Sequence, residues 1–370
     1  MEKEQHPKEK ESISKELVKV GITIGDLNGI GPEIVMKALK DNRILSDFIP
    51  VVYASNKVIS FYKKQLNIQE FNFQSCKTAS EVSPKKINVV NLWPEELPIE
   101  PGVSNTNGGA YALKSLEAAT QDLAAGKIDV LVTAPFSKEN VQKAGFNFVG
   151  HTEYLADLSG AKEALMVLVS GSLRVALVTT HIPVKDISAA LTKEQIVQKI
   201  EKFEQSLKRD FGILRPRIAV FGLNPHAGEN GKIGQEEQEI IIPAIQQTKN
   251  KGILAYGPYP ADGFFGSDMR QQFDGILAMY HDQGLAAFKA LCFDDGVNFT
   301  ADLPIVRTSP DHGTAFDIAG KNQANAQSLR SAIYLAIDVY RQRKAIKEMN
   351  ANPLPFSKEE KGRKENDRAE

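Results

Sequence analysis

The amino-acid sequence predicts an α/β protein built on a largely parallel sheet. Apolar runs of strand length alternate along the chain with segments whose apolar residues recur at helical spacing, and this alternation is typical of βαβ units. At 370 residues the chain also exceeds one typical domain, so we expect two domains that share a large buried core. The sequence contains no internal repeat and no Pro- or Ser-rich linker, so the domain boundary has to be inferred from topology.

The expected elements follow one another in a regular order. Apolar runs predict strands at Val18–Ile24, Phe48–Ala54, Ile87–Val90, Val130–Thr133, Leu165–Val169, Arg174–Thr179, Arg217–Phe221 and Asp274–Met279. Helical periodicity predicts helices at Pro32–Leu39, Val58–Gln65, Gly108–Ala125, Lys193–Asp210, Gln235–Lys249 and Ser328–Met349.

A glycine-rich loop, Gly25–Glu33, joins the first expected strand to the first expected helix. Glycines permit tight turns, Pro32 suits the first position of a helix, and Glu33 complements the helix dipole. The glycines stand at positions 25, 29 and 31, which does not match the dinucleotide-binding fingerprint. A structural turn and a ligand contact both remain open for this loop.

The composition excludes several classes of function. The 45 basic residues nearly balance the 46 acidic ones, so bulk charge gives no reason to expect nucleic acid or a membrane surface as a partner. The N-terminus is too polar for a signal peptide, and no apolar run approaches the roughly 20 residues of a spanning helix. Cys76 and Cys292 form neither a zinc-finger set nor a disulfide framework, which fits a reducing compartment. We therefore expect a soluble, cytoplasmic protein with charged, disordered tails at residues 1–16 and 351–370.

The stretch from Ala278 to Lys289 combines several chemically active side chains. An apolar run ends abruptly in His281, Asp282 and Gln283, and a helix-like segment carrying Lys289 follows. In α/β proteins ligands bind at the carboxyl ends of the strands. An imidazole, a carboxylate and a cation at such a place indicate chemistry, with an ordinary hydrogen-bonded histidine as the alternative.

Histidines gather at strand ends elsewhere in the chain too. His181, His226 and His281 each closely follow an expected strand, at intervals of 45 and 55 residues. These intervals exclude a His-Glu-x-x-His helix or a zinc finger, but they fit a site assembled from three separate loops. Three neutral imidazoles suit Zn²⁺ or a similar ion and leave coordination positions for substrate. Surface or core histidines without a metal are the alternative.

Further polar residues stand close to these histidines or follow them in the chain. Lys289, Asn298 and Arg307 follow the third histidine, and Lys and Arg beside a pocket suit a phosphate or carboxylate. Each of these cations alone is also compatible with a solvated surface charge. Asp282 suits the orientation of a metal-binding histidine, and Asp262 is either an active-site carboxylate or a turn-forming residue.

Taken together, these segments resemble the 4-hydroxythreonine-4-phosphate dehydrogenase family, NAD-dependent enzymes of pyridoxal phosphate synthesis. The matching stretches run from Gly21 to about Ala332. They read GITIGDLNGIGPEI, TAPFSKENV, GHTEYLA, THIPVKDIS, GLNPHAGENGKIGQEE, GPYPADGFF, MYHDQGLAAFK and GVNFTADLPIVRTSPDHGTAFDIAGK. The turn Asp26–Gly29 and the residues Tyr259 and Gly263 depart from the family pattern, and such changes bear on the choice of substrate.

The resemblance implies a role for each matching residue. It implies a divalent metal shared across a homodimer interface, with Zn²⁺ first and Mg²⁺, Mn²⁺ or Co²⁺ as alternatives, bound by His181, His226 and His281. It implies substrate contacts from His151, Thr152, Lys289, Asn298 and Arg307, and active-site support from Asp262 and Asp282. It implies NAD or NADP contacts from His312, Gly313, Thr314, Asp317 and Asn325.

The resemblance also implies a fold and a reaction. The fold is two α/β/α domains around an active-site cleft, similar to isocitrate and isopropylmalate dehydrogenases. The first domain comprises residues 17–142 and 308–350, and the second comprises residues 143–307, which include the metal ligands. The reaction oxidises 4-phosphohydroxy-L-threonine to 2-amino-3-oxo-4-phosphohydroxybutanoate, which loses CO₂ to give 3-amino-2-oxopropyl phosphate. A dehydrogenase of threonate or erythronate 4-phosphate is the nearer alternative. A metal-dependent hydrolase or aldolase is the more distant one.

Overall fold

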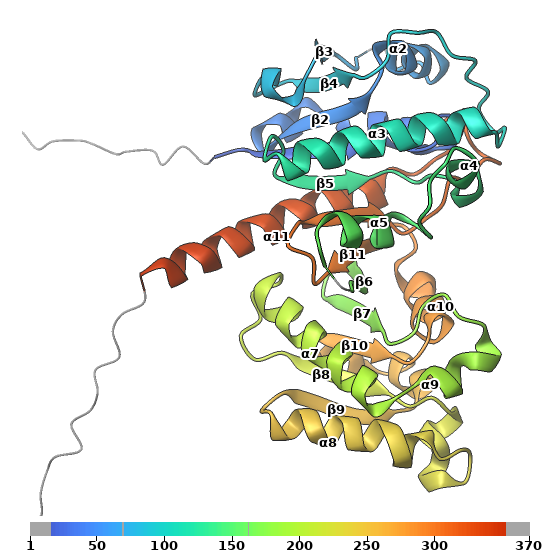
Figure 1. The fold of residues 1–370 in the computed structure, drawn as a ribbon, viewed down its shortest axis with the longest axis vertical. Coiled ribbons are helices and arrows are strands. Elements are labelled where there is room, and N and C mark those ends of the chain that lie inside the picture. The colour runs from blue at the N-terminus through green and yellow to red at the C-terminus, as the bar shows by residue number, and fades with distance from the viewer. Residues whose placement is uncertain (1–15, 69, 162, 353–370) are drawn as a thin grey trace, which may run out of the picture.

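The computed structural model describes residues 16–68, 70–161 and 163–352. The described strands form one continuous sheet in the order β3-β4-β2-β1-β5-β12-β11-β6-β7-β10-β8-β9, and the elements are stacked along one long axis (Figure 1). The predicted tails at 1–16 and 351–370 lie outside the described residues, apart from their innermost positions.

Every strand expected from the sequence is present. The strands are β1 (Val18–Thr23), β2 (Phe48–Ala54), β3 (Phe73–Cys76), β4 (Ile87–Asn91), β5 (Val130–Thr133), β6 (Leu165–Ser170), β7 (Leu173–Leu177), β8 (Arg217–Phe221), β9 (Leu254–Tyr259), β10 (Gly275–Ala278), β11 (Val297–Ala301) and β12 (Arg307–Pro310). Neighbours are parallel except near the middle, where β11 runs antiparallel to both β12 and β6, and β6 runs antiparallel to β7. The predicted α/β class with a largely parallel sheet is therefore confirmed.

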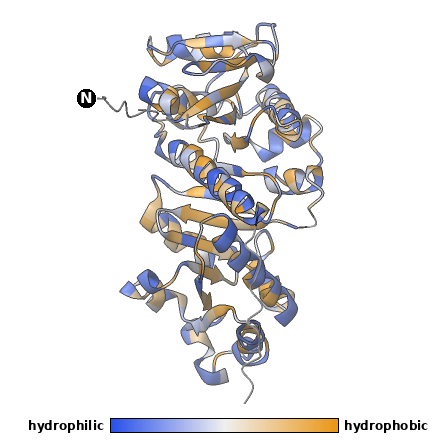
Figure 2. Ribbon diagram, turned by 90° about the vertical axis from the view of Figure 1, so that its left-hand side faces the viewer, coloured by the Kyte–Doolittle hydropathy of each residue, from blue (hydrophilic) through white to orange (hydrophobic). Residues whose placement is uncertain are grey.

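The helices lie on both faces of this sheet. They are α1 (Gly31–Leu39), α2 (Asn56–Gln65), α3 (Thr106–Ala124), α4 (Lys138–Lys143), α5 (His151–Leu158), α6 (Ile187–Ala190), α7 (Lys193–Arg209), α8 (Ile242–Asn250), α9 (Ala261–Phe265), α10 (His281–Cys292) and α11 (Gln327–Ala351). All six predicted helical segments occur, and the one predicted from Gln235 begins with a π-helical turn before α8. Figure 2 shows apolar residues concentrated on the strands, with helices that carry both apolar and polar residues around them.

The core divides according to the alternation of side chains along each strand. In β10, Leu277 belongs to a cluster that α1, α2, α7, α8 and α11 cover, whereas Ile276 and Ala278 belong to one that α9 and α10 cover. In the first half of the chain the same alternation separates two apolar clusters. One is the large cluster that also contains Leu277, and the other is covered by α3, α4 and α5. Because successive strand residues face opposite sides, the sheet is buried on both faces, as parallel sheets require. In β2 every residue is buried.

Four strands were not predicted, because their sequences do not read as apolar runs. The strand β12 has the sequence Arg-Thr-Ser-Pro and yet every residue in it is buried. Its polar groups are satisfied internally: the Thr308 hydroxyl donates to the Ala332 carbonyl oxygen at 2.8 Å, and Arg307 donates to two threonine hydroxyls. The strands β3 and β11 contain Gln or Asn, and β9 contains Gly257-Pro258, all of which are unfavourable to a strand prediction.

The sheet and the large core cluster both continue across the predicted domain boundary. Between β12 and β11 the two halves are joined by antiparallel pairing, and α11 packs against β5, β11 and β12 at this place (Figure 1). The division into domains at 142/143 and 307/308 stays a prediction. Within the described residues, no helix is long and apolar enough to cross a membrane.

Candidate active site

A cavity of about 400 Å³ lies where residues from both halves of the sheet converge. It is bordered by the end of β5, by β12, by the start of α5 and by α10. The predicted site residues that line it are His151, Thr152, His181, Lys289, Asn298, Arg307, His312 and Gly313. Segments that are far apart in the sequence thus meet beside the strand ends, where α/β proteins bind their ligands.

Arg307 is the most unusual of these residues, because its charge is buried without a carboxylate in direct contact, and Glu153, which lines the same cavity, acts on it only at longer range. The side chain begins β12 and is 3% exposed. Its guanidinium donates to the Thr133 hydroxyl at 2.6 and 3.1 Å and to the Thr300 hydroxyl at 3.0 Å. No carboxylate of the described residues lies within ion-pairing distance of it, and burial lowers the pKa of Arg307 to about 10. The residue is therefore still a cation at neutral pH, and it faces a cavity that an anion would fit.

His151 supplies a neutral imidazole on the same cavity. Its ring stacks on that of Phe136, with centroids 3.8 Å apart and planes inclined by 21°. Burial lowers the pKa of His151 well below its ordinary value, and the charges of Arg307 and Lys138 act in the same direction. Its Nε2 atom is buried and has no hydrogen-bond partner among the described residues. A ligand in the cavity would satisfy this nitrogen, since buried polar atoms normally have partners.

Lys289 and Asn298 also line this cavity. The Lys289 ammonium donates to the Asp311 carbonyl oxygen at 3.1 Å and lies 3.3 Å from the Asp311 carboxylate. Burial raises the pKa of Asp311, and the Lys289 charge opposes that rise. The Oδ1 atom of Asn298 is buried and also has no partner within the described chain. The buried His151 and Asn298 atoms thus face the same cavity as three cations and two carboxylates, which are Lys138, Lys289, Arg307, Glu153 and Asp311.

His181 and His281 lie next to each other, as the predicted metal site requires. Their ring centroids are 6.1 Å apart, and burial lowers the pKa of His181, which favours the neutral form that binds metals. His281 begins α10, and its Nδ1 lies 2.7 Å from the Asp282 carboxylate. That contact leaves the Nε2 atom of His281 available, which is the arrangement in which a carboxylate orients a metal-binding histidine.

The third predicted metal ligand does not join this pair within one chain. His226 is exposed in a turn, Pro225–Gly231, where φ is between 42° and 76° from His226 to Asn230. The buried Glu237 carboxylate holds this strained turn by accepting from the backbone N–H groups of Leu223 and Asn224, both at 2.7 Å. Asp262 is exposed in α9. The residues that the structure describes contain no group of three His, Cys, Asp or Glu placed to hold a metal ion.

The predicted cofactor residues are divided between the cavity and the surface. His312 and Gly313 line the cavity, and the Nε2 atom of His312 is buried without a partner in the described chain. The Thr314 carbonyl oxygen accepts from the Ile30 N–H at 2.9 Å, so this loop packs directly on the glycine-rich loop after β1. At Gly29 a Cβ atom would lie 2.9 Å from that same oxygen, which explains the glycine. Asp317 and Asn325 are exposed and do not line the cavity.

Several lining residues were not singled out from the sequence. They are Thr133, Phe136, Lys138, Glu153 and Asp311. All of them lie inside the quoted family stretches, and Thr133 ends a predicted strand. The rule that ligands bind after the carboxyl ends of strands therefore pointed to this segment, although no histidine marked it.

Comparisons with known proteins identify the family of this chain. The model of the family described as "Pyridoxal phosphate biosynthetic protein PdxA" matches residues 46–336. A 4-hydroxythreonine-4-phosphate dehydrogenase of Bacteroides thetaiotaomicron is 51% identical over 338 residues, covering 91% of this chain and 93% of that protein. The enzyme of the same name from Sulfurihydrogenibium sp. is 44% identical over 329 residues, covering 89% of this chain and 100% of that protein.

A solved structure extends the similarity to the fold. The crystal structure of 4-hydroxythreonine-4-phosphate dehydrogenase from Klebsiella pneumoniae has a TM-score of 0.75 and 36% sequence identity, covering 87% of this chain and 99% of that one. The family match, the relatives and the fold point in one direction. The chain belongs to the PdxA family of pyridoxal phosphate biosynthetic proteins.

Proposed function

We propose that this chain is an NAD-dependent dehydrogenase that oxidises 4-phosphohydroxy-L-threonine in pyridoxal phosphate biosynthesis. The observation that carries the proposal is Arg307, a buried guanidinium whose partners are two hydroxyls and which faces a cavity. A desolvated cation of this kind favours a phosphate, which it can bind through two N–H groups at once. A relative named for this activity is 51% identical to the chain over 338 residues.

The remaining lining residues fit the other groups of such a substrate. Lys289, which is partly exposed, suits the outer oxygens of the phosphate as a point charge. The unpartnered Asn298 Oδ1 suits a donor on the substrate, such as an ammonium or a hydroxyl, and the His151 imidazole suits its hydroxyl or its carboxylate. The phosphate does not take part in the reaction. Binding it holds the reacting carbon and hydroxyl of the substrate in place.

The proposed reaction removes two hydrogens from a secondary alcohol and then one carboxyl group. The carbon gives up a hydride, the hydroxyl gives up a proton, and the resulting β-keto acid loses CO₂ to leave 3-amino-2-oxopropyl phosphate. When bound, NAD would accept the hydride, and a divalent ion would stabilise negative charge on the substrate oxygen. The chain itself holds the phosphate at Arg307 and presents a neutral His151 to the substrate.

Metal dependence belongs to this proposal, and the residues present fit a metal in part. A zinc–nitrogen bond of about 2.1 Å places a ring centroid roughly 3 Å from the ion, so two tetrahedral imidazole ligands have centroids roughly 5 Å apart. The His181 and His281 centroids are 6.1 Å apart, so the two rings would have to move closer together to share one ion. The exposed His226 and Asp262 suit a site completed by a second protomer, as in the homodimer that the family resemblance implies. Zn²⁺ suits these imidazoles best, with Mg²⁺, Mn²⁺ or Co²⁺ as alternatives.

The cofactor and the cellular location are parts of the same proposal. We place NAD, or NADP, beside the loop that carries His312 and Gly313, because this loop lines the cavity and packs on the glycine-rich loop after β1. A cytoplasmic location is supported by Cys76 and Cys292, which are both unpaired.

The test is a panel of NAD-reduction assays followed by absorbance of NADH. The substrates are 4-phosphohydroxy-L-threonine, threonate 4-phosphate and erythronate 4-phosphate, each with Zn²⁺, Mg²⁺, Mn²⁺ and Co²⁺. We expect the largest kcat/KM with the phosphorylated hydroxythreonine. A larger kcat/KM with either sugar acid would assign the chain to that substrate instead, and hydrolysis or aldol cleavage without NADH formation would refute the dehydrogenase.

A further inference from the structure

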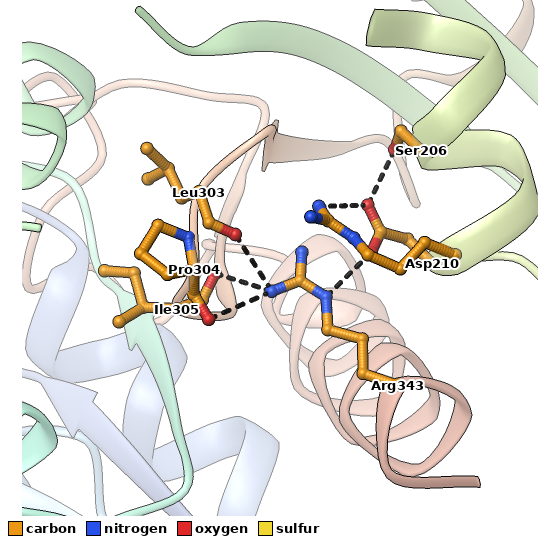
Figure 3. Close-up of polar contacts among 7 residues, drawn as sticks. Ser206, Asp210, Leu303, Pro304, Ile305 and Arg343 are labelled. Carbon is orange, nitrogen blue, oxygen red and sulfur yellow. Dashed lines mark hydrogen bonds and ion pairs between the residues drawn. The ribbon is translucent and has the colours of Figure 1, made fainter. Parts of the chain in front are cut away.

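The loop that joins β11 to β12 is held by an arginine from a distant helix. These two antiparallel strands carry Asn298 and Arg307, and the loop between them spans residues 302–306. Arg343 of α11 reaches it, as Figure 3 shows. A single nitrogen of Arg343, Nη1, donates to the carbonyl oxygens of Leu303, Pro304 and Ile305, at 3.1, 3.4 and 3.0 Å.

Arg343 is itself fixed from its other side. Its Nε donates to the Asp210 carboxylate at 2.7 Å, and Asp210 stands directly after α7. The Asp210 side chain is fully buried, and it also accepts from Arg209 at 2.8 and 3.1 Å and from the Ser206 hydroxyl at 2.7 Å. Burial alone would raise the pKa of Asp210, but its contacts with Arg209 and Arg343 outweigh burial and keep that pKa below its ordinary value. The carboxylate is thus a permanent anchor for Arg343 at neutral pH.

The converging carbonyls explain why an arginine is needed here. Three successive carbonyl dipoles point at one nitrogen and repel one another, so a cation at that place stabilises the turn. Guanidinium is planar and donates in several directions, which allows it to bind the loop and the anchor together. Lysine has one nitrogen at the end of a flexible chain and cannot reproduce both contacts. Arg343 therefore links α7, α11 and the β11–β12 loop.

This loop determines where the phosphate-binding residue enters the sheet. Only Val306 separates Ile305, the last loop residue that Arg343 contacts, from Arg307. The Val306 carbonyl oxygen accepts from the Leu131 N–H of the neighbouring strand at 3.0 Å. In an antiparallel pair the connecting loop sets the register, and a slip of one residue would turn every side chain to the opposite face. A looser loop would therefore displace the Arg307 guanidinium from Thr133 and Thr300.

We propose that Arg343, anchored by Asp210, is a positioning residue that sets the placement of Arg307 in the cavity. This inference rests on the proposed phosphate-binding role of Arg307, but its first measurement does not depend on that role. The variant R343M removes the contacts, and R343K keeps the charge. R341M is the matched control, because Arg341 lies in the same helix and donates to the Asp47 carbonyl oxygen at 3.0 Å, away from the loop.

The first measurement is amide hydrogen exchange over residues 303–309 of the full chain without substrate. We expect exchange about tenfold faster or more in R343M, a smaller effect in R343K, and no change in R341M. Should R343M yield no folded protein, R343K answers the same question. Wild-type exchange rates in the Arg343 variants would overturn the proposal.

The second measurement separates positioning from a general loss of stability. We expect KM for the phosphorylated substrate to rise about tenfold in R343M, with a smaller rise in R343K and little change in kcat or in KM for NAD. An unchanged KM for the substrate, or an equal rise in R341M, would overturn the proposal. If the wild-type chain oxidised none of the substrates, the proposed function would fail instead. The Kd for inorganic phosphate, measured by calorimetry, would then replace KM. We expect the same tenfold weakening of phosphate binding in R343M, and an unchanged Kd would overturn the proposal.

Discussion

The substitution R307M should separate binding from stability. Removing the guanidinium deletes three hydrogen bonds to threonine hydroxyls, which together contribute roughly 3 kcal/mol to stability at about 1 kcal/mol each. The same guanidinium is desolvated: burial lowers its pKa to about 10, and this downward shift corresponds to roughly 3 kcal/mol against the charged form. The two contributions nearly cancel. The free energy of unfolding of the R307M variant should therefore stay within about 2 kcal/mol of the wild-type value.

Binding of the phosphorylated substrate should respond very differently. A buried guanidinium that bonds a phosphate through two N–H groups contributes about 3 kcal/mol, so kcat/KM should fall roughly 150-fold in R307M. The assay is NADH formation with 4-phosphohydroxy-L-threonine and with 4-hydroxy-L-threonine, which lacks the phosphate. The loss should be confined to the phosphorylated compound. The control is R174M, which removes another partly buried arginine that donates to carbonyl oxygens outside the cavity. Equal losses with both compounds, or an unchanged kcat/KM, would refute phosphate anchoring by Arg307.

Three further predictions concern the histidines and the second cation. H281A should lose bound divalent metal, as measured by elemental analysis, and full metal content in this variant would count against the site. D282N should bind the metal roughly 10- to 100-fold more weakly, because Asp282 orients the His281 imidazole. His151 has a depressed pKa in the folded chain, so below pH ~6.5 the unfolded chain takes up a proton that the folded chain does not. The free energy of unfolding should consequently decrease as the pH is lowered below ~6.5, by up to about 1.4 kcal/mol per pH unit from this residue. Urea titrations at several pH values should show a smaller decrease in H151Q. K289M should raise KM for the phosphorylated substrate less than tenfold, since this lysine is partly exposed and pairs with Asp311; a larger effect than that of R307M would reverse the assignment of the main anchor.

The sequence was most informative where the physical signals were local. The alternation of apolar runs and helical patterns predicted the α/β class, and all the strands that read as apolar runs are present. The histidine positions predicted a site made of His181, His226 and His281; the rings of His181 and His281 lie 6.1 Å apart, and the metal site itself stays a prediction. Local patterns carry no information on what lies across a subunit boundary. The relation of His226 to this pair therefore stays a prediction.

The strand β12 shows why the remaining part of the site escaped the sequence patterns. Burial normally selects apolar residues, because an unpaired polar group inside a protein is costly. In Arg-Thr-Ser-Pro the first three positions break that rule: Arg307 bonds to threonines on β5 and β11, Thr308 bonds to a helix carbonyl, and Ser309 is buried with them. The partners of these groups come from elements distant in sequence, so no window of the chain reveals them. A buried strand that is mostly polar retains its polar groups only when they are paired. Arg307, which has no carboxylate in direct contact, is paired incompletely until an anion enters the cavity. The strand that local patterns fail to predict is therefore also the one whose burial most strongly indicates a binding site.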